Sequence, residues 1–290
     1  MWFWLAFCSA ITGAVEITLN KKALNKVSAV VLTWSLFTLS LPLTAYFALK
    51  NGLPSLNQMF FLGVTASSVT FIFSKTISNE TIKNNLVSKV FPLTAFNGFF
   101  TYVFGLLFLS ESLRLIPVIG LFLTVVGSYI LNADQTKEDL LKPFKLLFTN
   151  KASLIFLFAI MLNALTAIFD KIGINNTQPV NSAFALLAED VIMIVILTTY
   201  LLKKEHKKWI KEFKDNFIIL LANGFIYGLS TLLVFSALTG GPVALVLGVK
   251  RLQIFFILIF GYIFLKDKPT KYSWIAAAIM TLGTLMIKLG

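Results

Sequence analysis

The sequence predicts an all-α integral membrane protein with ten transmembrane helices, arranged as two inverted five-helix repeats. The composition supports this class, since 57% of the residues are hydrophobic and only 13% are charged, about half the charge of a soluble protein. Apolar stretches of about 17 to 25 residues, the length that crosses a bilayer, follow one another along the chain. The second half also nearly repeats the first. Ten helices use almost the whole chain and leave no soluble catalytic domain.

The predicted helices of the first repeat cover residues 2–20, 28–49, 55–77, 84–108 and 115–132. Those of the second repeat cover residues 152–170, 181–202, 216–238, 242–265 and 272–288. We therefore expect a first repeat at 1–132, a connecting loop at 133–151 and a second repeat at 152–290.

Prolines lie where some of these helices begin or bend. Pro54 and Pro242 precede predicted helices, at positions where a missing backbone N–H is tolerated. Pro42 and Pro92 lie inside predicted helices and should kink them.

Two short echoes show the internal repeat. Leu19-Asn20-Lys21 recurs 150 positions later as Phe169-Asp170-Lys171, each near the end of an apolar helix. GLLFLSE at 105–111 recurs 156 positions later as GYIFLKD at 261–267. Sixteen residues after each acid stands a glycine, at Gly127 and Gly283. Because each half holds an odd number of helices, the second half must enter the membrane in the opposite orientation, an architecture on which many secondary transporters build alternating access.

The positions of the lysines predict the orientation in the membrane. Odd-numbered connections and their helix ends hold most of them, whereas the opposite face has only Lys50, Arg114, Lys171 and Lys288. By the positive-inside rule the lysine-rich face is cytoplasmic and both termini lie outside. This distribution accounts for the net charge of +12 without a nucleic-acid partner. The high ratio of lysine to arginine suggests a prokaryotic source and hence the cytoplasmic (inner) membrane.

Residues that carry enzymatic or metal chemistry are scarce. Cys8 is the only cysteine and His206 the only histidine, so neither an internal disulfide nor a cysteine-based metal site can form. We find no nucleophile elbow, no phosphate-cradling glycine loop and no paired histidine ligands. The sequence therefore predicts no enzyme, no metal and no cofactor. The expected partners are the lipid bilayer and a small-molecule substrate, and monomer and homodimer both stay open.

Six ionisable residues inside the predicted helices are the first functional candidates: Glu16, Lys89, Glu189, Asp190, Lys250 and Arg251. Each costs several kcal/mol in the membrane unless it is paired or hydrated. Glu189 and Lys250 lie at the same depth, about 12 Å from one face, and Glu16 and Lys89 lie at equal depths near the other. We hypothesise that these two pairs form alternating gates. Alternatively, they are static ion pairs that stabilise the fold, or charges that face hydrated cavities. The acids, including Asp190, could also carry a coupling proton.

Polar and aromatic residues within the apolar stretches supply the rest of a predicted substrate cavity: Trp34, Tyr102, Asn163, Asn223 and Tyr227. Burying such groups against lipid is costly, so they should face the bundle interior. We expect them to line the cavity together with Glu189, Lys250 and Arg251. The planar fork of Arg251 suits a carboxylate or a phosphate.

Two further segments have patterns typical of a membrane-surface helix and of close helix packing. Residues 203–214 are rich in lysine, yet Trp209, Ile210 and Phe213 fall on one helical face. This segment could lie in the membrane interface or be a solvated run of charges. The glycines of the GxxxG motif at 224–228 permit close helix approach.

The chain has two predicted five-helix repeats, Phe-Leu-x-Glu/Asp turns at Glu111 and Asp267, and the segment FSALTGGPVA at 235–244. In these features it resembles the EamA branch of the drug/metabolite transporter superfamily. The resemblance covers the whole chain and implies a secondary carrier, proton-coupled or exchanging, in many cases an exporter. Members commonly have both termini in the cytoplasm, the reverse of what the lysines here predict. Residues 75–80 depart from the usual apolar turn, which leaves the register around Lys89 open.

We expect a secondary active transporter that exports a small polar or zwitterionic, amino-acid-like metabolite across the cytoplasmic membrane by alternating access. A cavity with charges of both signs could satisfy an ammonium and a carboxylate together. An organic-cation or drug exporter, with the acids and Trp34 as the cation site, is the second interpretation. A lipid-headgroup flippase or scramblase and a non-transporting membrane receptor are the further alternatives.

Overall fold

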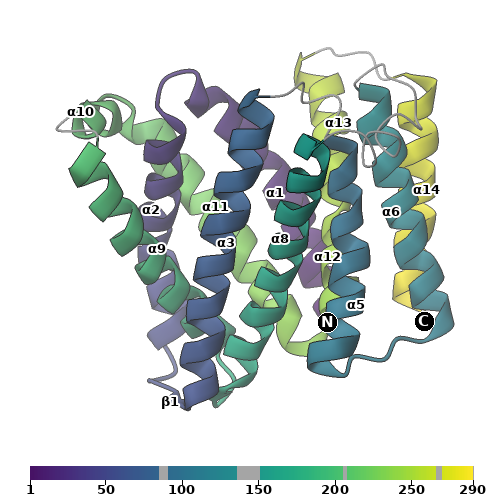
Figure 1. Ribbon diagram of the computed structural model, residues 1–290, viewed down its shortest axis with the longest axis horizontal. Helices are drawn as coiled ribbons and strands as arrows, with labels where there is room; N and C mark the ends of the chain where they lie inside the picture. Colours follow the sequence, from purple (N-terminus) through teal and green to yellow (C-terminus); the bar gives the residue numbers. More distant parts are fainter. Residues whose placement is uncertain (85–90, 136–150, 205–207, 266–269, 290) are drawn as a thin grey trace. The chain divides into compact units, whose positions relative to one another are not determined.

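The computed structural model describes residues 1–84, 91–135, 151–204, 208–265 and 270–289. These residues are almost entirely helical (Figure 1). The exceptions to helix and loop are two short strands, β1 (Ser55–Leu56) and β2 (Thr177–Gln178). They pair antiparallel, with Ser55 opposite Gln178 and Leu56 opposite Thr177.

Six helices in the described ranges are long and apolar enough to cross a bilayer. They are α1 (Trp2–Leu24), α2 (Ala29–Leu49), α8 (Lys151–Asn175), α9 (Ser182–Lys204), α11 (Phe217–Gly240) and α14 (Lys271–Leu289). Large apolar side chains on these helices are exposed, for example Leu202 and Ile218. Apolar side chains on the outside suit a lipid surrounding, where the helix satisfies its own backbone groups. The prediction of an all-α membrane protein is confirmed.

The other helical segments are α3 (Gln58–Asn84), η1 (Phe91–Phe96), α5 (Asn97–Leu109), α6 (Leu115–Gln135), α10 (Lys208–Asp215), α12 (Val243–Lys250) and α13 (Leu252–Leu265). Two predicted helices, 84–108 and 242–265, are interrupted. The first contains the 3₁₀ segment η1, where Pro92 has no N–H for the helical ladder. The second breaks at Arg251. Pro42, in contrast, lies within the continuous helix α2.

The described chain divides into two compact units. Unit 1 comprises Met1–Ser68 and Asp170–Gly240, and unit 2 comprises Val69–Phe169 and Gly241–Gly290. Each unit therefore combines pieces from both halves of the sequence, and the helices α3 and α8 contribute to both.

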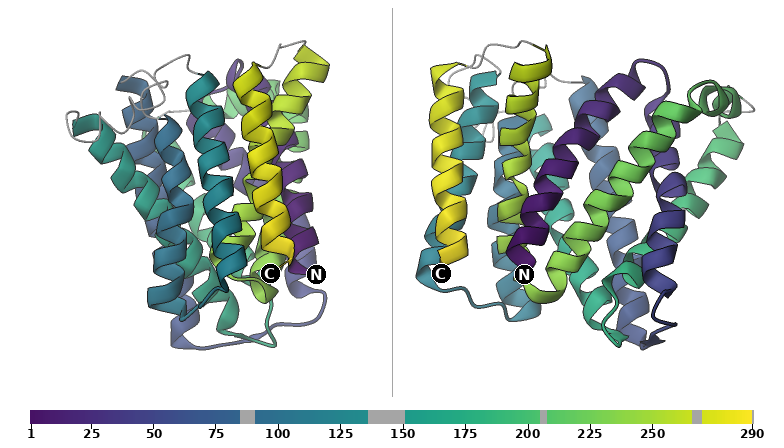
Figure 2. Two further views of the ribbon diagram at one scale, coloured as in Figure 1. Left: turned by 90° about the vertical axis from the view of Figure 1, so that its right-hand side faces the viewer. Right: turned by 180° about the vertical axis from the view of Figure 1, so that it is seen from behind.

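The core of unit 1 is a row of packed helices. α1 packs against α11, α11 against α2, and α2 against α9; α1 and α11 lie side by side in Figure 2. A Cβ atom on Gly224 would lie 2.6 Å from the Cβ of Leu39, and one on Gly228 would lie 2.9 Å from the Cβ of Ser40. The GxxxG motif of α11 thus permits the close approach of α2.

The short helix α10 packs on the end of this row. Its aromatic residues Trp209 and Phe213 make edge-on ring contacts with Trp34 of α2, at centroid distances of 5.1 and 5.3 Å. The Glu212 carboxylate accepts a hydrogen bond from the backbone N–H of Ser28 (2.9 Å). Trp209 and Phe213 therefore contact α2, whereas Ile210 is exposed. The position of this segment in the membrane interface stays a prediction.

Unit 2 is built on the close packing of α6 against α14. A Cβ atom on Gly283 would lie 2.5 Å from the Gly120 carbonyl oxygen and 2.9 Å from Cγ2 of Thr124. A Cβ atom on Gly127 would lie 2.9 Å from the Ala276 carbonyl oxygen and 2.6 Å from Cγ of Met280. Both glycines are needed because backbone atoms of the facing helix occupy the space of a side chain.

The acid of the Phe-Leu-x-Glu turn has a structural role in unit 2. Glu111 Oε2 accepts a hydrogen bond from the Val243 N–H (2.8 Å), the first residue of α12. Ser110 before it adopts a left-handed conformation (φ 54°). A carboxylate at a helix N-terminus satisfies a free N–H and favours the helix dipole. The equivalent acid, Asp267, lies outside the described residues.

Candidate functional site

Amide side chains of α1 and α11 form one end of a polar network inside unit 1. The Asn20 side chain donates a hydrogen bond to Glu16 Oε1 (3.1 Å) and accepts one from Asn223 Nδ2 (2.7 Å). Glu16 and Asn20 share a face of α1 because they are four residues apart. Asn223 is fully buried. The two amides therefore tie the Glu16 carboxyl group to α11.

The neighbouring acids Glu189 and Asp190 of α9 form the other end. Both are buried, with 8% and 1% of their surface exposed. Ser40 of α2 donates a hydrogen bond to Asp190 Oδ2 (3.3 Å), whereas Glu189 lies beside Ser67 of α3 and Asp170 of α8. Adjacent residues on a helix point about 100° apart, so the two carboxyl groups face different helices.

The phenol of Tyr227 lies between the two ends. Ser67 Oγ donates a hydrogen bond to Asp170 Oδ1, which places a fourth acid in the group. Tyr227 is close enough to all four carboxyl groups, those of Glu16, Asp170, Glu189 and Asp190, to interact with each electrostatically. We call these four acids and Tyr227 the acid network.

Two buried acceptors in this region lack donors. Across the described ranges, Glu189 Oε1 and Asn223 Oδ1 are buried without a hydrogen-bond partner. An unsatisfied buried acceptor costs about 1–3 kcal/mol. A group that carries N–H donors and no acceptor, such as an ammonium group, suits acceptors of this kind. The described residues contain no group of three or more His, Cys, Asp or Glu side chains arranged to hold a metal ion.

Unit 2 holds the predicted basic residues. Arg251 stands at the break between α12 and α13, and its guanidinium donates hydrogen bonds to Ser128 Oγ of α6 (3.3 Å) and to the Thr94 carbonyl of η1 (3.4 Å). Thr94 lies in η1, which interrupts the predicted helix 84–108. Arg251 thus connects the two interrupted helices, whereas the sequence predicted for it only a place in the cavity. Lys250, the last residue of α12, is half-buried.

The other predicted cavity residues are dispersed. Trp34 lies in unit 1, but it packs against α10 and donates its indole N–H to Thr198 Oγ1 (2.9 Å). In unit 2, Asn163 Oδ1 accepts a hydrogen bond from Asn97 (3.0 Å), and Tyr102 is half-buried on α5.

Neither hypothesised gate is tested by this arrangement. Lys89, the partner expected for Glu16, lies outside the described residues. Glu189 belongs to unit 1 and Lys250 to unit 2, so their pairing stays a prediction.

Sequence reasoning missed one member of the acid network, Asp170, and three residues that are hydrogen-bonded to its acids or to Asn223: Asn20, Ser40 and Ser67. A signal for all four exists in the internal repeat. Asn20 and Asp170 are equivalent under the offset of 150, as are Ser40 and Asp190. Ser67 and Asn223 are equivalent under the offset of 156. The repeat partners of the predicted residues Asp190 and Asn223 are Ser40 and Ser67, and the repeated Asn20 and Asp170 are each other's partners.

Comparison with known proteins gives three likenesses. The sequence model of the EamA-like transporter family matches residues 1–133 and 150–289. An "Uncharacterized transporter in cobO 3'region" of Sinorhizobium sp. is 30% identical over 125 residues, which are 43% of this chain and 86% of that protein. A solved structure described as "Crystal structure of protein" superposes with a TM-score of 0.77 at 13% identity, over 99% of this chain and 98% of that one. At that identity the last likeness shows the fold alone.

Proposed function

Since the chain belongs to the EamA-like transporter family, we propose that it is a secondary active transporter of a small polar or zwitterionic, amino-acid-like metabolite. Family membership makes it a multi-pass membrane transporter of the drug/metabolite type. The substrate class, the export direction, the cytoplasmic membrane and alternating access belong to the proposal.

The observation that carries the substrate class is the acid network with its unsatisfied acceptors. Four carboxyl groups come together inside the membrane-spanning part of unit 1, where charge is costly and marks a functional site by default. Glu189 Oε1 and Asn223 Oδ1, both buried, need donors. An ammonium group of the substrate would supply donors and a positive charge at once. One of these acids could also bind the proton that is coupled to transport.

Contacts related by the repeat offsets support ten helices in two inverted repeats. Asn223 is hydrogen-bonded to Asn20, and Ser67 is hydrogen-bonded to Asp170. Each bond thus joins the repeat equivalents of the residues in the other bond. Ser40 and Asp190, equivalent to each other, are hydrogen-bonded together. Such reciprocal contacts are what a local two-fold axis produces.

The packing of α6 against α14 follows the same rule. Gly127 meets Ala276 and Met280, while Gly283 meets Gly120 and Thr124. Adding 156 to 120, 124 and 127 gives 276, 280 and 283. The two glycine contacts therefore involve equivalent positions of the two repeats, which favours an ancestral duplication. It also favours the two-state rocking motion that inverted repeats permit.

An organic-cation exporter is the second candidate, because the acid network would also attract a cation that has no carboxylate. The deciding experiment measures flux of pooled amino acids, organic cations and nucleotide sugars into proteoliposomes, with and without an imposed pH gradient. We expect saturable movement of amino acids that responds to the gradient. Saturable movement of the cations alone would replace our proposal with the second candidate.

The site assignment is tested in the same assay. Glu189→Gln should lower the rate at least about tenfold, because the network loses a charge that binds the ammonium. Asp215→Asn, which removes an exposed carboxyl group of α10, is the matched control and should keep the full rate. No flux of any class, with fluorescent lipid translocated instead, would favour the flippase alternative and refute the proposal.

A further inference from the structure

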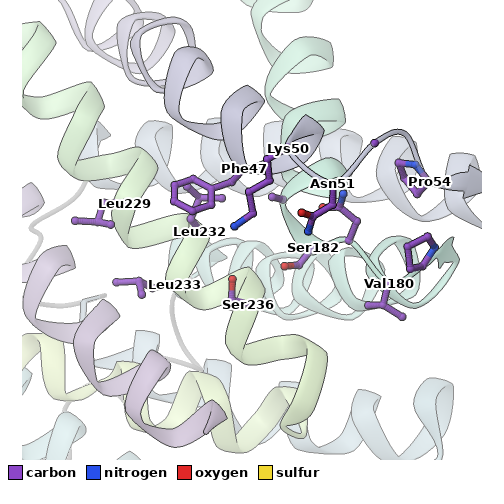
Figure 3. A pocket seen from close by; sticks show the side chains of 14 residues that line it. Phe47, Lys50, Asn51, Pro54, Val180, Ser182, Leu229, Leu232, Leu233 and Ser236 are labelled. Atoms are coloured by element: carbon purple, nitrogen blue, oxygen red, sulfur yellow. The ribbon is translucent and has the colours of Figure 1, made fainter.

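A cavity of about 370 Å³ lies at the end of unit 1 where α2 turns toward α3. None of its lining residues belongs to the acid network. Its walls come from the end of α2, the turn before β1, the start of α9 and one face of α11 (Figure 3). Ala183 lines the cavity, whereas Glu189 and Asp190 lie about two turns further along α9, roughly 10 Å away at 1.5 Å per residue.

The cavity has one charged wall residue among those that line it in the described chain, Lys50. In Figure 3 its amino group extends from the end of α2 across the cavity toward Ser236 of α11. The Lys50 Nζ atom lies 4.8 Å from the ring centroid of Phe47, a cation–π arrangement that holds the amino group over the opening. Asn51 and Ser182 add polar groups near it.

The α11 wall is largely apolar. Leu229, Leu232 and Leu233 line it beside Ser236. A ligand that fills the cavity therefore meets one positive charge at one end and aliphatic side chains along its length.

The frame of the cavity is fixed by hydrogen bonds. Asn181, at the start of α9, donates its side-chain N–H to the Ala48 carbonyl (2.8 Å) and accepts the Phe184 N–H at Oδ1 (3.0 Å). The pairing of β1 with β2 joins the two loops that border it. A cavity held in this way is pre-formed, which lowers the cost of ordering on binding.

We propose that this cavity is a binding site for a small apolar carboxylate, with Lys50 as its charge partner. The volume lies within the range of small-molecule sites, about 300–1,000 Å³. A lysine offers a compact point charge, which suits a single carboxylate better than a large delocalised anion. The inference deepens the proposed function, because an amino-acid-like substrate supplies such a carboxylate; the binding step itself is tested without transport.

The test uses the full-length protein in phosphatidylcholine nanodiscs, with Cys8→Ser to remove the single cysteine and Ser236→Cys as the reporter. The reporter is labelled with the anionic sulfonatoethyl methanethiosulfonate and, separately, with its cationic trimethylammonium counterpart. Adding Lys50→Gln should lower the anionic-to-cationic rate ratio about fivefold, since the local positive charge is lost. Lys26→Gln, at an exposed site on the α1–α2 connection, is the control and should leave the ratio unchanged.

Ligand protection identifies the chemistry. N-acetyl-leucine should slow labelling at least about threefold when Lys50 is present, and its neutral amide, which differs only in charge, should not. An unchanged rate ratio in Lys50→Gln, or equal protection by acid and amide, would overturn the proposal. Protection by phosphatidylglycerol in the nanodisc, without protection by the acid, would assign the cavity to a lipid phosphate instead.

These results are independent of the flux assay. A labelling failure would leave the transporter proposal standing, and absence of flux would leave a carboxylate site that binds without transport. Each reconstituted variant should elute as a single species with an unchanged melting temperature, so that a change in labelling reports charge and not misfolding.

Discussion

At the scale of single residues, the structure separates acids that share a polar network from a base that holds the fold. The carboxyl groups of Glu189 and Asp190 are buried among hydroxyl groups and other acids of unit 1. Arg251 donates to Ser128 and to the Thr94 carbonyl in unit 2. Its guanidinium thus joins α6 to the 3₁₀ segment η1.

Arg251→Gln should therefore lower stability by roughly 2 kcal/mol, the order of a lost charged hydrogen bond. Thermal unfolding of the purified protein in detergent measures the change. Arg114→Gln, an arginine exposed before α6, controls for loss of charge. If Arg251→Gln instead keeps full stability and only weakens substrate binding, the role assigned from the sequence is the correct one.

At the scale of elements, glycine sets how closely helices pack. The Cβ of a residue at 283 would meet the Gly120 carbonyl oxygen at 2.5 Å, and a backbone atom cannot move aside as a side chain can. The glycines at 224 and 228 have the same role against α2, where the nearest atoms are Leu39 Cβ and Ser40 Cβ. Because a Cβ atom is fixed to the backbone, it cannot move aside either.

Gly283→Ala is expected to destabilise the protein by about 1–3 kcal/mol, because α14 must separate from α6. Gly240→Ala is the matched control, since its added Cβ would meet nothing nearer than Trp2 Cβ at 3.9 Å. Urea or thermal unfolding in detergent compares the two variants. Equal stabilities would show that the helices relax without cost and would contradict the packing argument.

At the scale of the whole molecule, the orientation in the membrane remains a prediction from the lysines. In the Cys8→Ser background, Lys26→Cys should be labelled by a membrane-impermeant maleimide only after the cells are permeabilised. Ser55→Cys, in β1 beyond the other end of α2, should react in intact cells, as the positive-inside rule requires. Both side chains are exposed, so accessibility does not bias the comparison. The opposite pattern would place the termini in the cytoplasm.

The sequence by itself determined the all-α membrane class, the family resemblance and the acids Glu16, Glu189 and Asp190 as candidates. The length of an apolar stretch and the presence of a charged residue inside it are local properties of the sequence. They can be recognised without knowing which helices contact one another. Only the tertiary structure decided that Asn20, Ser40, Ser67 and Asp170 join the network, and that Trp34 packs on α10. These assignments depend on contacts between segments far apart in the chain. Such contacts follow from how helix faces pack, which no single segment specifies.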